Sequence, residues 1–164
     1  MKRPLILSAV LVAVSAMVLG FASVVGSTSP PMGVPVQQQS LWTLLDAAMA
    51  SHQQLDVIQA KGLIAWEKRL LIVDVREPAE FRAGHIQRAV NVPRGLLEFR
   101  IAGFAKERDK PILVYCKEGY RGALSGRTLR ELGYTQVSNL VGGWDAWSRY
   151  EQQFAEPIPR PFWE

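Results

Sequence analysis

Cys116, the single cysteine of the chain, stands where a nucleophile can be activated. It directly follows the apolar run 111–115 and precedes a predicted helix at about 122–132. In open α/β sheets, sites lie outside the carboxyl ends of the strands. A turn that enters a helix aims several backbone N–H groups at one point, where the helix dipole adds partial positive charge. Such a turn favours the thiolate, which is the reactive form of cysteine.

The residues that follow Cys116 support this interpretation. Lys117 and Arg121 add formal positive charge, and Gly119 permits a positive φ with which the loop can curl around the sulfur. Glu118 opposes anion binding, so the amides and Arg121 must outweigh it. A lone cysteine is more often a small buried hydrophobe. Here its position, the glycine and the flanking cations favour a catalytic role.

Other chemistry has little support in the sequence. One cysteine excludes an intrachain disulfide and a Cys-x-x-Cys redox pair, and with only His52 and His85 a metal site would be poor in ligands. We expect no metal and no organic cofactor. Asp74 and Arg76 stand at the end of a predicted strand, where we expect them to support neighbouring loops through an ion pair. For His85 we expect a structural hydrogen bond.

The composition is that of a globular protein. The chain has 164 residues, of which 48% are apolar and 21% are charged. Its formal charge is +4, but no run of clustered lysines and arginines is present. We therefore predict no nucleic-acid surface.

From residue 41 onward, apolar strands alternate with helical patterns. Continuous apolar strands separated by helices indicate a parallel sheet covered on both faces, in an α/β fold. Residues 53–69 fit neither pattern clearly. The predicted strands are 70–75, 89–92, 111–115 and 136–141, and the predicted helices are 41–51, a short one from Pro78 to Gly84, 95–104, 122–132 and 143–150.

The N-terminal segment has the pattern of an export signal or a membrane anchor. Lys2 and Arg3 precede an uncharged apolar run at 5–25, which is also long enough to cross a hydrocarbon core of ~30 Å. Either interpretation places the rest of the chain outside the cytoplasm, which in a bacterium is the periplasm. The expected parts are a signal peptide or anchor at 1–26, a linker at 27–40, a domain at 41–155 and a proline-rich tail at 156–164.

Three motifs in order resemble the rhodanese, or thiosulfate sulfurtransferase, family. C-K-E-G-Y-R (Cys116–Arg121) is similar to its Cys-x-x-Gly-x-Arg active-site loop. Asp74–Pro93 contains segments similar to its Asp-x-Arg and Gly-His-Ile motifs, although Gln87 and Arg88 replace residues of a turn. Leu140–Trp147 resembles its Gly-Gly-Trp signature. The resemblance spans roughly residues 53–153 and extends to exported single-domain rhodaneses.

The resemblance implies a rhodanese-like five-stranded parallel sheet and a cysteine that cycles through a persulfide. A thiosulfate-like anion would give its sulfane sulfur to Cys116, and cyanide or a thiol would then accept it. Covalent catalysis of this kind divides one transfer into two steps. Cys116 and Arg121 are the implied catalytic residues. Those implied to hold the bound sulfur are Lys117, Glu118, Gly119, Tyr120 and Arg121.

Two other classes of function stay open. The same fold can act as a sulfur carrier or as a docking module for one partner, with little turnover on small donors. The other class is a cysteine phosphatase or arsenate reductase on a related scaffold. The resemblance implies that loop length separates these enzymes, because the phosphatase pattern has one residue more before its arginine. This chain has Gly122 at that position, so we expect negligible hydrolysis of p-nitrophenyl phosphate.

The N-terminal pattern gives a first testable prediction. If residues 1–26 direct export, cell fractionation will find the protein in the periplasm or the inner membrane. Recovery from the cytosol with residues 1–26 intact would contradict this interpretation.

Overall fold

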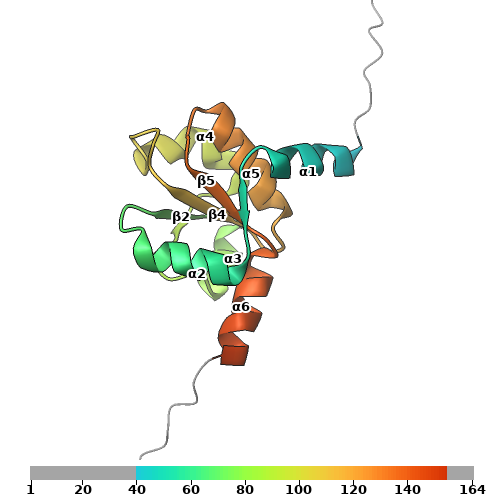
Figure 1. Ribbon diagram of the computed structural model, residues 1–164, viewed down its shortest axis with the longest axis vertical. Helices are drawn as coiled ribbons and strands as arrows, with labels where there is room; N and C mark the ends of the chain where they lie inside the picture. The colour runs from blue at the N-terminus through green and yellow to red at the C-terminus, as the bar shows by residue number, and fades with distance from the viewer. Residues whose placement is uncertain (1–39, 155–164) are drawn as a thin grey trace, which may run out of the picture. The chain divides into compact units, whose positions relative to one another are not determined.

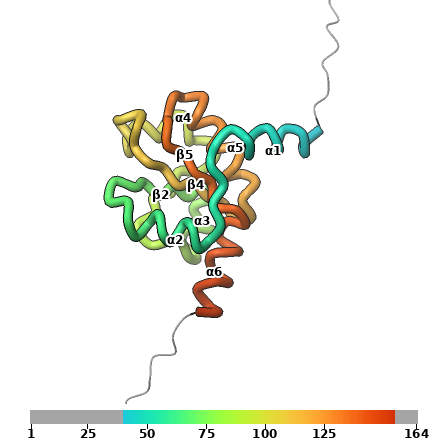
Figure 2. The backbone as a smooth tube through the Cα atoms, viewed as in Figure 1, coloured from blue at the N-terminus to red at the C-terminus, as the bar shows by residue number. Residues whose placement is uncertain are grey.

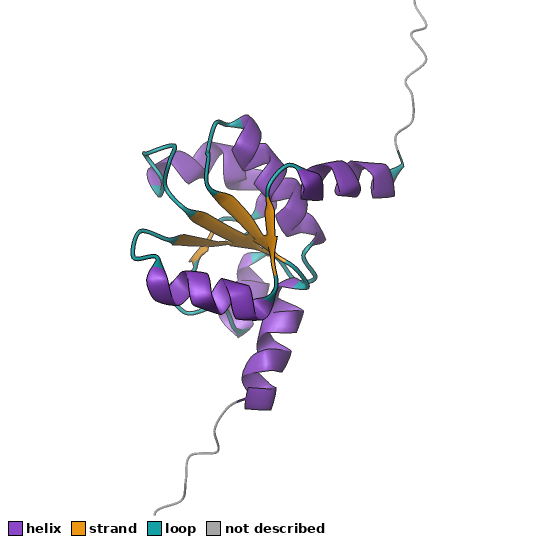
Figure 3. Cartoon of the chain, viewed as in Figure 1, coloured by secondary structure: helices purple, strands orange, loops and turns teal. Residues whose placement is uncertain are grey.

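A five-stranded parallel sheet forms the centre of the structure, a computed structural model that describes residues 40–154. The strands lie in the order β1-β5-β4-β2-β3, and each neighbouring pair is parallel. Their bounds are β1 (Gln53–Leu55), β2 (Leu71–Asp74), β3 (Val90–Asn91), β4 (Ile112–Tyr115) and β5 (Val137–Leu140). The parallel sheet implied by the resemblance is therefore confirmed (Figures 1 and 3).

Helices cover both faces of this sheet, as Figure 3 shows. α4 and α5 pack on one face, with α1 against α5, whereas α2 and α6 pack on the other. Figure 2 follows the chain through these layers. The helices are α1 (Leu41–Ala50), α2 (Val57–Trp66), α3 (Pro78–Ala83), α4 (Leu97–Arg100), α5 (Tyr120–Glu131) and α6 (Gly143–Phe154), with short 3-10 turns η1 (Arg94–Leu96) and η2 (Ile101–Gly103).

β4 connects the two layers of the core. All of its residues are buried, as a continuous apolar run predicts. Because successive side chains point to opposite faces, Ile112 and Val114 contact the layer of α4 and α5, whereas Leu113 and Tyr115 contact that of α2 and α6. The strand that directly precedes Cys116 is thus packed on both of its faces.

Two stretches differ from the sequence-based expectation. Residues 53–69, which fitted neither pattern, form β1 and α2, and a capping box at Asp56 starts the helix. The single helix expected at 95–104 is instead η1, α4 and η2 in succession. Gly95 and Gly103 fall in the two 3-10 turns, where glycine's low helix propensity weakens a continuous helix. Leu97 and Ile101 still form one buried face.

Several expected parts lie outside the described residues. These are the hydrophobic helix at 5–25, the signal or anchor at 1–26 and the tail at 156–164. Of the linker at 27–40, only Ser40 is described, and its hydroxyl accepts a hydrogen bond from the Thr43 N–H at the start of α1. Between residues 40 and 154, no helix combines the length and the hydropathy needed to cross a membrane.

A buried ion pair fixes the carboxyl end of β2. The Arg76 guanidinium donates to both carboxylate oxygens of Asp74 at 2.7–3.0 Å, and the two side chains are 3% and 0% exposed. Arg76 also donates to the Gly84 carbonyl at 2.7 Å and lies 5.0 Å from the Trp144 ring. The pair therefore connects the end of β2 to the end of α3 and the start of α6.

This pair predicts a large and local effect on stability. Arg76→Ala leaves the Asp74 carboxylate buried without its partner, which should lower the free energy of unfolding by about 3–5 kcal/mol. The matched control is Arg69→Ala, because Arg69 pairs with Asp109 on the surface, where such a pair contributes ~0–1 kcal/mol. Urea unfolding of both variants measures the difference. Equal losses would refute the assigned role of Asp74 and Arg76.

Candidate active site

The loop after β4 wraps around the sulfur of Cys116. Gly119 has φ 99°, in the left-handed region, and its N–H points back at the Cys116 Sγ over 3.2 Å. α5 begins at the next residue, Tyr120. The first N–H groups of a helix have no acceptor within it, so they carry partial positive charge. Cys116 therefore lies at a helix N-terminus, as the sequence predicts.

The start of α6 supports this loop through the backbone. The Trp144 N–H donates to the Cys116 carbonyl at 2.8 Å, and the Asp145 N–H donates to the Lys117 carbonyl at 3.0 Å. Gly143, which directly precedes Trp144, has φ 55°. A Cβ atom at Gly143 would stand 2.4 Å from the Cys116 carbonyl oxygen and 2.6 Å from that of Lys117. The close approach of the two backbones therefore requires glycine, which explains the Gly-Gly-Trp motif physically.

Asn139 of β5 holds the loop from the side of the sheet. Its Nδ2 donates to the Gly119 carbonyl at 3.3 Å and to the Gln54 Oε1 at 2.8 Å. The sequence analysis missed Asn139. Asn139 could have been found because it is a polar residue within a buried strand, where its side chain needs a hydrogen-bond partner.

Glu80 neutralises Arg121, a second contact that the sequence analysis missed. The Arg121 guanidinium donates to both carboxylate oxygens of Glu80 at 3.2 and 3.3 Å. Burial opposes ionisation of Glu80, but hydrogen bonds from Arg121 and the Glu77 N–H outweigh it and lower its pKa. For Arg121, burial acts to lower the pKa, but the contacts of its guanidinium with Glu80 outweigh burial and raise the pKa. Arg121 thus ties α5 to α3 through an ion pair.

The charged side chains of the loop form ion pairs that the sequence did not predict. Lys117 Nζ lies 3.9 Å from the Glu118 carboxylate, so both side-chain cations of the loop have a carboxylate partner. The carboxylates offset part of the formal positive charge around Cys116. Backbone amides and the helix terminus add positive potential at the sulfur, beside Arg121, whose pKa, despite burial, is raised by Glu80 as well as by its contact with Cys116.

The residues of the loop enclose a cavity of about 140 Å³ at the thiol. This thiol pocket is lined by Cys116, Lys117, Glu118, Tyr120 and Arg121. Cys116 itself is only 2% exposed, so its sulfur is reached through the pocket. The space suits a small anion, whose charge the loop amides can meet.

Asp74, Arg76 and His85 do not line the thiol pocket. The first two form the buried pair at the end of β2. The His85 ring stacks on Phe81 at 3.8 Å between ring centroids, and its Nδ1 lies 3.0 Å from the Phe81 carbonyl oxygen. These contacts are structural, as expected for His85.

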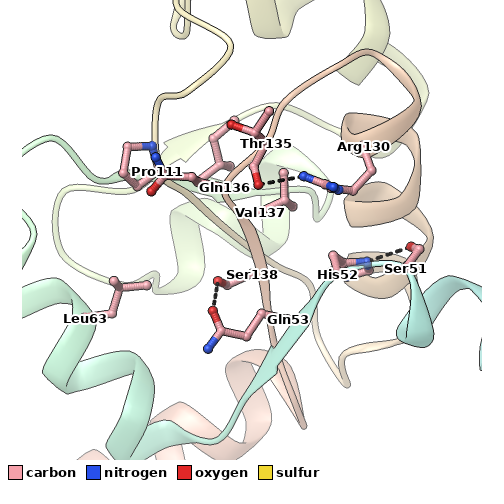
Figure 4. A pocket seen from close by; sticks show the side chains of 11 residues that line it. Ser51, His52, Gln53, Leu63, Pro111, Arg130, Thr135, Gln136, Val137 and Ser138 are labelled. Atoms are coloured by element: carbon pink, nitrogen blue, oxygen red, sulfur yellow. Dashed lines mark hydrogen bonds between the residues drawn. The ribbon is translucent and has the colours of Figure 1, made fainter.

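A larger cavity lies at the opposite edge of the sheet. Figure 4 shows the residues that line it, at the amino ends of β1, β4 and β5. The volume of this cavity is about 390 Å³. His52 beside it binds Ser51 through Nδ1, and burial lowers its pKa. Its Nε2 lies against Gly126 of α5.

In the described part of the chain, no three His, Cys, Asp or Glu side chains gather as a metal site would require.

Comparison with known proteins establishes the family. The model of the rhodanese-like domain matches residues 56–150, which is more than half of the chain. The chain therefore belongs to the rhodanese-like family.

Among its relatives, a sulfurtransferase of Allochromatium vinosum is 36% identical over 104 residues, covering 63% of this chain and 95% of that protein. Thiosulfate sulfurtransferase PspE of Escherichia coli is 34% identical over 70 residues, covering 43% and 67%. The Bacillus subtilis protein YqhL is 39% identical over 80 residues, and the match covers 49% of this chain and 62% of that protein. The family and its sulfurtransferases support sulfur transfer as the general class of reaction.

A solved structure from Rhodopseudomonas palustris is similar over most of the chain. It is 31% identical with a TM-score of 0.63, and the match covers 77% of this chain and 99% of that one. That protein is described as one of unknown function and a possible tyrosine phosphatase.

The contact of α6 with the loop gives a testable prediction. Gly143→Ala should displace the loop, because the methyl group would collide with two carbonyl oxygens and alanine is strained at this φ. We expect severalfold slower alkylation of Cys116 by iodoacetamide and a loss of stability of about 1–3 kcal/mol. The control is Gly62→Ala in α2, where a Cβ meets nothing within 4 Å and a gain of about 0.5–1 kcal/mol is expected. Unchanged alkylation in Gly143→Ala would contradict the supporting role of α6.

Proposed function

We propose that this protein transfers a sulfane sulfur from a thiosulfate-like donor to a thiophilic acceptor through a persulfide on Cys116. The observation that carries the proposal is the position of Cys116 Sγ, which lies 3.2 Å from the Gly119 backbone nitrogen at the N-terminus of α5. Preorganised amides at this point can stabilise an anion in the transition state. The sulfurtransferases among the relatives support the same reaction class.

The first half-reaction loads the cysteine. The Cys116 thiolate attacks the outer sulfur of thiosulfate, and the bond between the two sulfurs of the donor breaks. Sulfite leaves with the bonding electron pair, while the outer sulfur stays on Cys116 as a persulfide. The loop amides meet the charge of the donor and then that of the persulfide. Lys117 at the rim of the pocket attracts the anion.

The second half-reaction transfers the sulfur from the Cys116 persulfide to the acceptor. Cyanide or a thiolate attacks the terminal sulfur, the persulfide bond breaks, and Cys116 returns as a thiolate. No electrons are required from outside, and no cofactor takes part. Arg121 holds the start of α5 against α3 through Glu80, so it preserves the shape of the loop in both steps.

The length of the loop favours sulfur over phosphorus. Gly119 closes the turn on the sulfur itself, and Arg121 already lies in the first turn of α5. The resulting pocket of about 140 Å³ suits a sulfur atom better than a phosphate ester with its oxygens hydrogen-bonded. We therefore favour sulfur transfer over the phosphatase activity suggested for the Rhodopseudomonas palustris protein, and the experiment below tests both.

We also propose that this reaction takes place outside the cytoplasm. The proposal rests on the apolar run at 5–25 behind Lys2 and Arg3. In that compartment the domain at 41–155 would be released after cleavage or tethered to the inner membrane.

Intact mass spectrometry tests the proposed function. After incubation with thiosulfate, the protein should gain the mass of one sulfur atom, and cyanide should remove it with release of thiocyanate. Cys116→Ser should gain nothing, whereas Ser125→Ala, which changes a buried hydroxyl of α5, should gain the sulfur normally.

Other outcomes separate the alternatives. A protein that takes up the sulfur but never passes it to cyanide or small thiols would be a carrier for one partner. Hydrolysis of p-nitrophenyl phosphate that depends on Cys116, with no gain of sulfur, would refute the proposal in favour of a phosphatase.

A further inference from the structure

A second cavity of about 240 Å³ adjoins the thiol pocket, and Glu118 and Tyr120 line both. The other walls of this side cavity include Met49 from α1, Gln54 from β1 and Val141 after β5. α1 and β1 precede residue 56, at which the match to the rhodanese-like family begins. The chain therefore adds a wall beside its reactive sulfur from a part outside the family match.

The side cavity offers an apolar surface. The Met49 thioether, the Val141 side chain and the Tyr120 ring line it, and Trp42 of α1 extends this surface by an edge-on contact with Tyr120 at 6.4 Å between ring centroids. Gln54 accepts a hydrogen bond from Asn139, so these two polar residues partly satisfy each other. An apolar cavity of about 150 Å³ can hold benzene, so this volume accommodates a phenyl or short alkyl group.

The charged residues that line the side cavity indicate which ligands it can bind. Among the described residues that line the side cavity, Glu118 alone is charged. Glu118 also lines the thiol pocket, where Lys117 and Arg121 accompany it, whereas no cation is among the described residues that line the side cavity. An anionic group in the side cavity would therefore meet the Glu118 charge without compensation, which favours an uncharged apolar group there.

We infer that the side cavity binds the uncharged apolar substituent of a thiol that accepts sulfur from Cys116. This inference rests on the proposed function. The acceptor thiolate attacks the terminal sulfur of the persulfide, a new sulfur–sulfur bond forms to the acceptor, and the bond to Cys116 Sγ breaks. Cys116 leaves as a thiolate, and the acceptor departs as a persulfide. No oxidant or reductant is consumed.

Acceptor kinetics on thiosulfate-loaded protein test the inference. Benzyl mercaptan should show a KM about tenfold below that of 2-mercaptoethanol, because only its substituent fills the cavity. The anionic 4-(mercaptomethyl)benzoate should lose this advantage through Glu118. Met49→Glu should raise the KM for benzyl mercaptan about tenfold and leave that for cyanide unchanged. The control Ala47→Glu adds the same charge at an exposed position of α1 and should change neither.

A binding measurement independent of sulfur chemistry accompanies the kinetics. Toluene should shift the amide NMR resonances of Gly119, Val141 and Gly142 in the wild type and not in Met49→Glu. Equal KM values for the two neutral thiols, or resonances that toluene leaves in place, would overturn the inference while sulfur loading stands. Failure to load sulfur, with toluene shifts intact, would instead refute the proposed function of Cys116.

Discussion

The backbone of the Cys116 loop is held between two helix N-termini, and the site depends on this arrangement. α5 begins at Tyr120 on one side of the sulfur, while α6 donates to the Cys116 and Lys117 carbonyls on the other. The Cys116 and Lys117 carbonyls are thus bonded to α6, while the Gly119 N–H faces the sulfur. Gly143 is the residue that permits this contact, since any side chain there would separate the two backbones.

The charges around the loop fit an enzyme that must both bind and release anions. Arg121 is committed to Glu80, and Lys117 lies near Glu118, so neither is a free counter-ion for a permanently bound anion. Amides that are fixed before the substrate arrives need no reorganisation during the reaction. In the proposed reaction, a site based on amides can thus stabilise thiosulfate, persulfide and departing sulfite in turn without trapping any of them through a strong ion pair.

The sequence predicted the parts of the site that are local and missed those that depend on long-range pairing. The buried strand before Cys116, the glycine that closes the loop and the helix after it follow from neighbouring residues. The ion pair of Arg121 with Glu80 was not predicted, because Glu80 is 41 residues away and its proximity follows only from the packing of α3 beside α5. Likewise, β1 was ambiguous because its three residues gain their strand conformation by pairing with β5.

Amide resonances of the loop test the central claim most directly. When thiosulfate converts Cys116 into a persulfide, the account predicts that the largest NMR shifts occur in the backbone N–H groups of Gly119, Tyr120 and Arg121. The guanidinium resonances of Arg121 should move little, because its Nη1 and Nη2 groups donate to Glu80. Sulfur loading that leaves the loop amide resonances in place and strongly shifts those of the Arg121 guanidinium would contradict the account. It would show that side-chain charge, not the backbone amides, binds the anion.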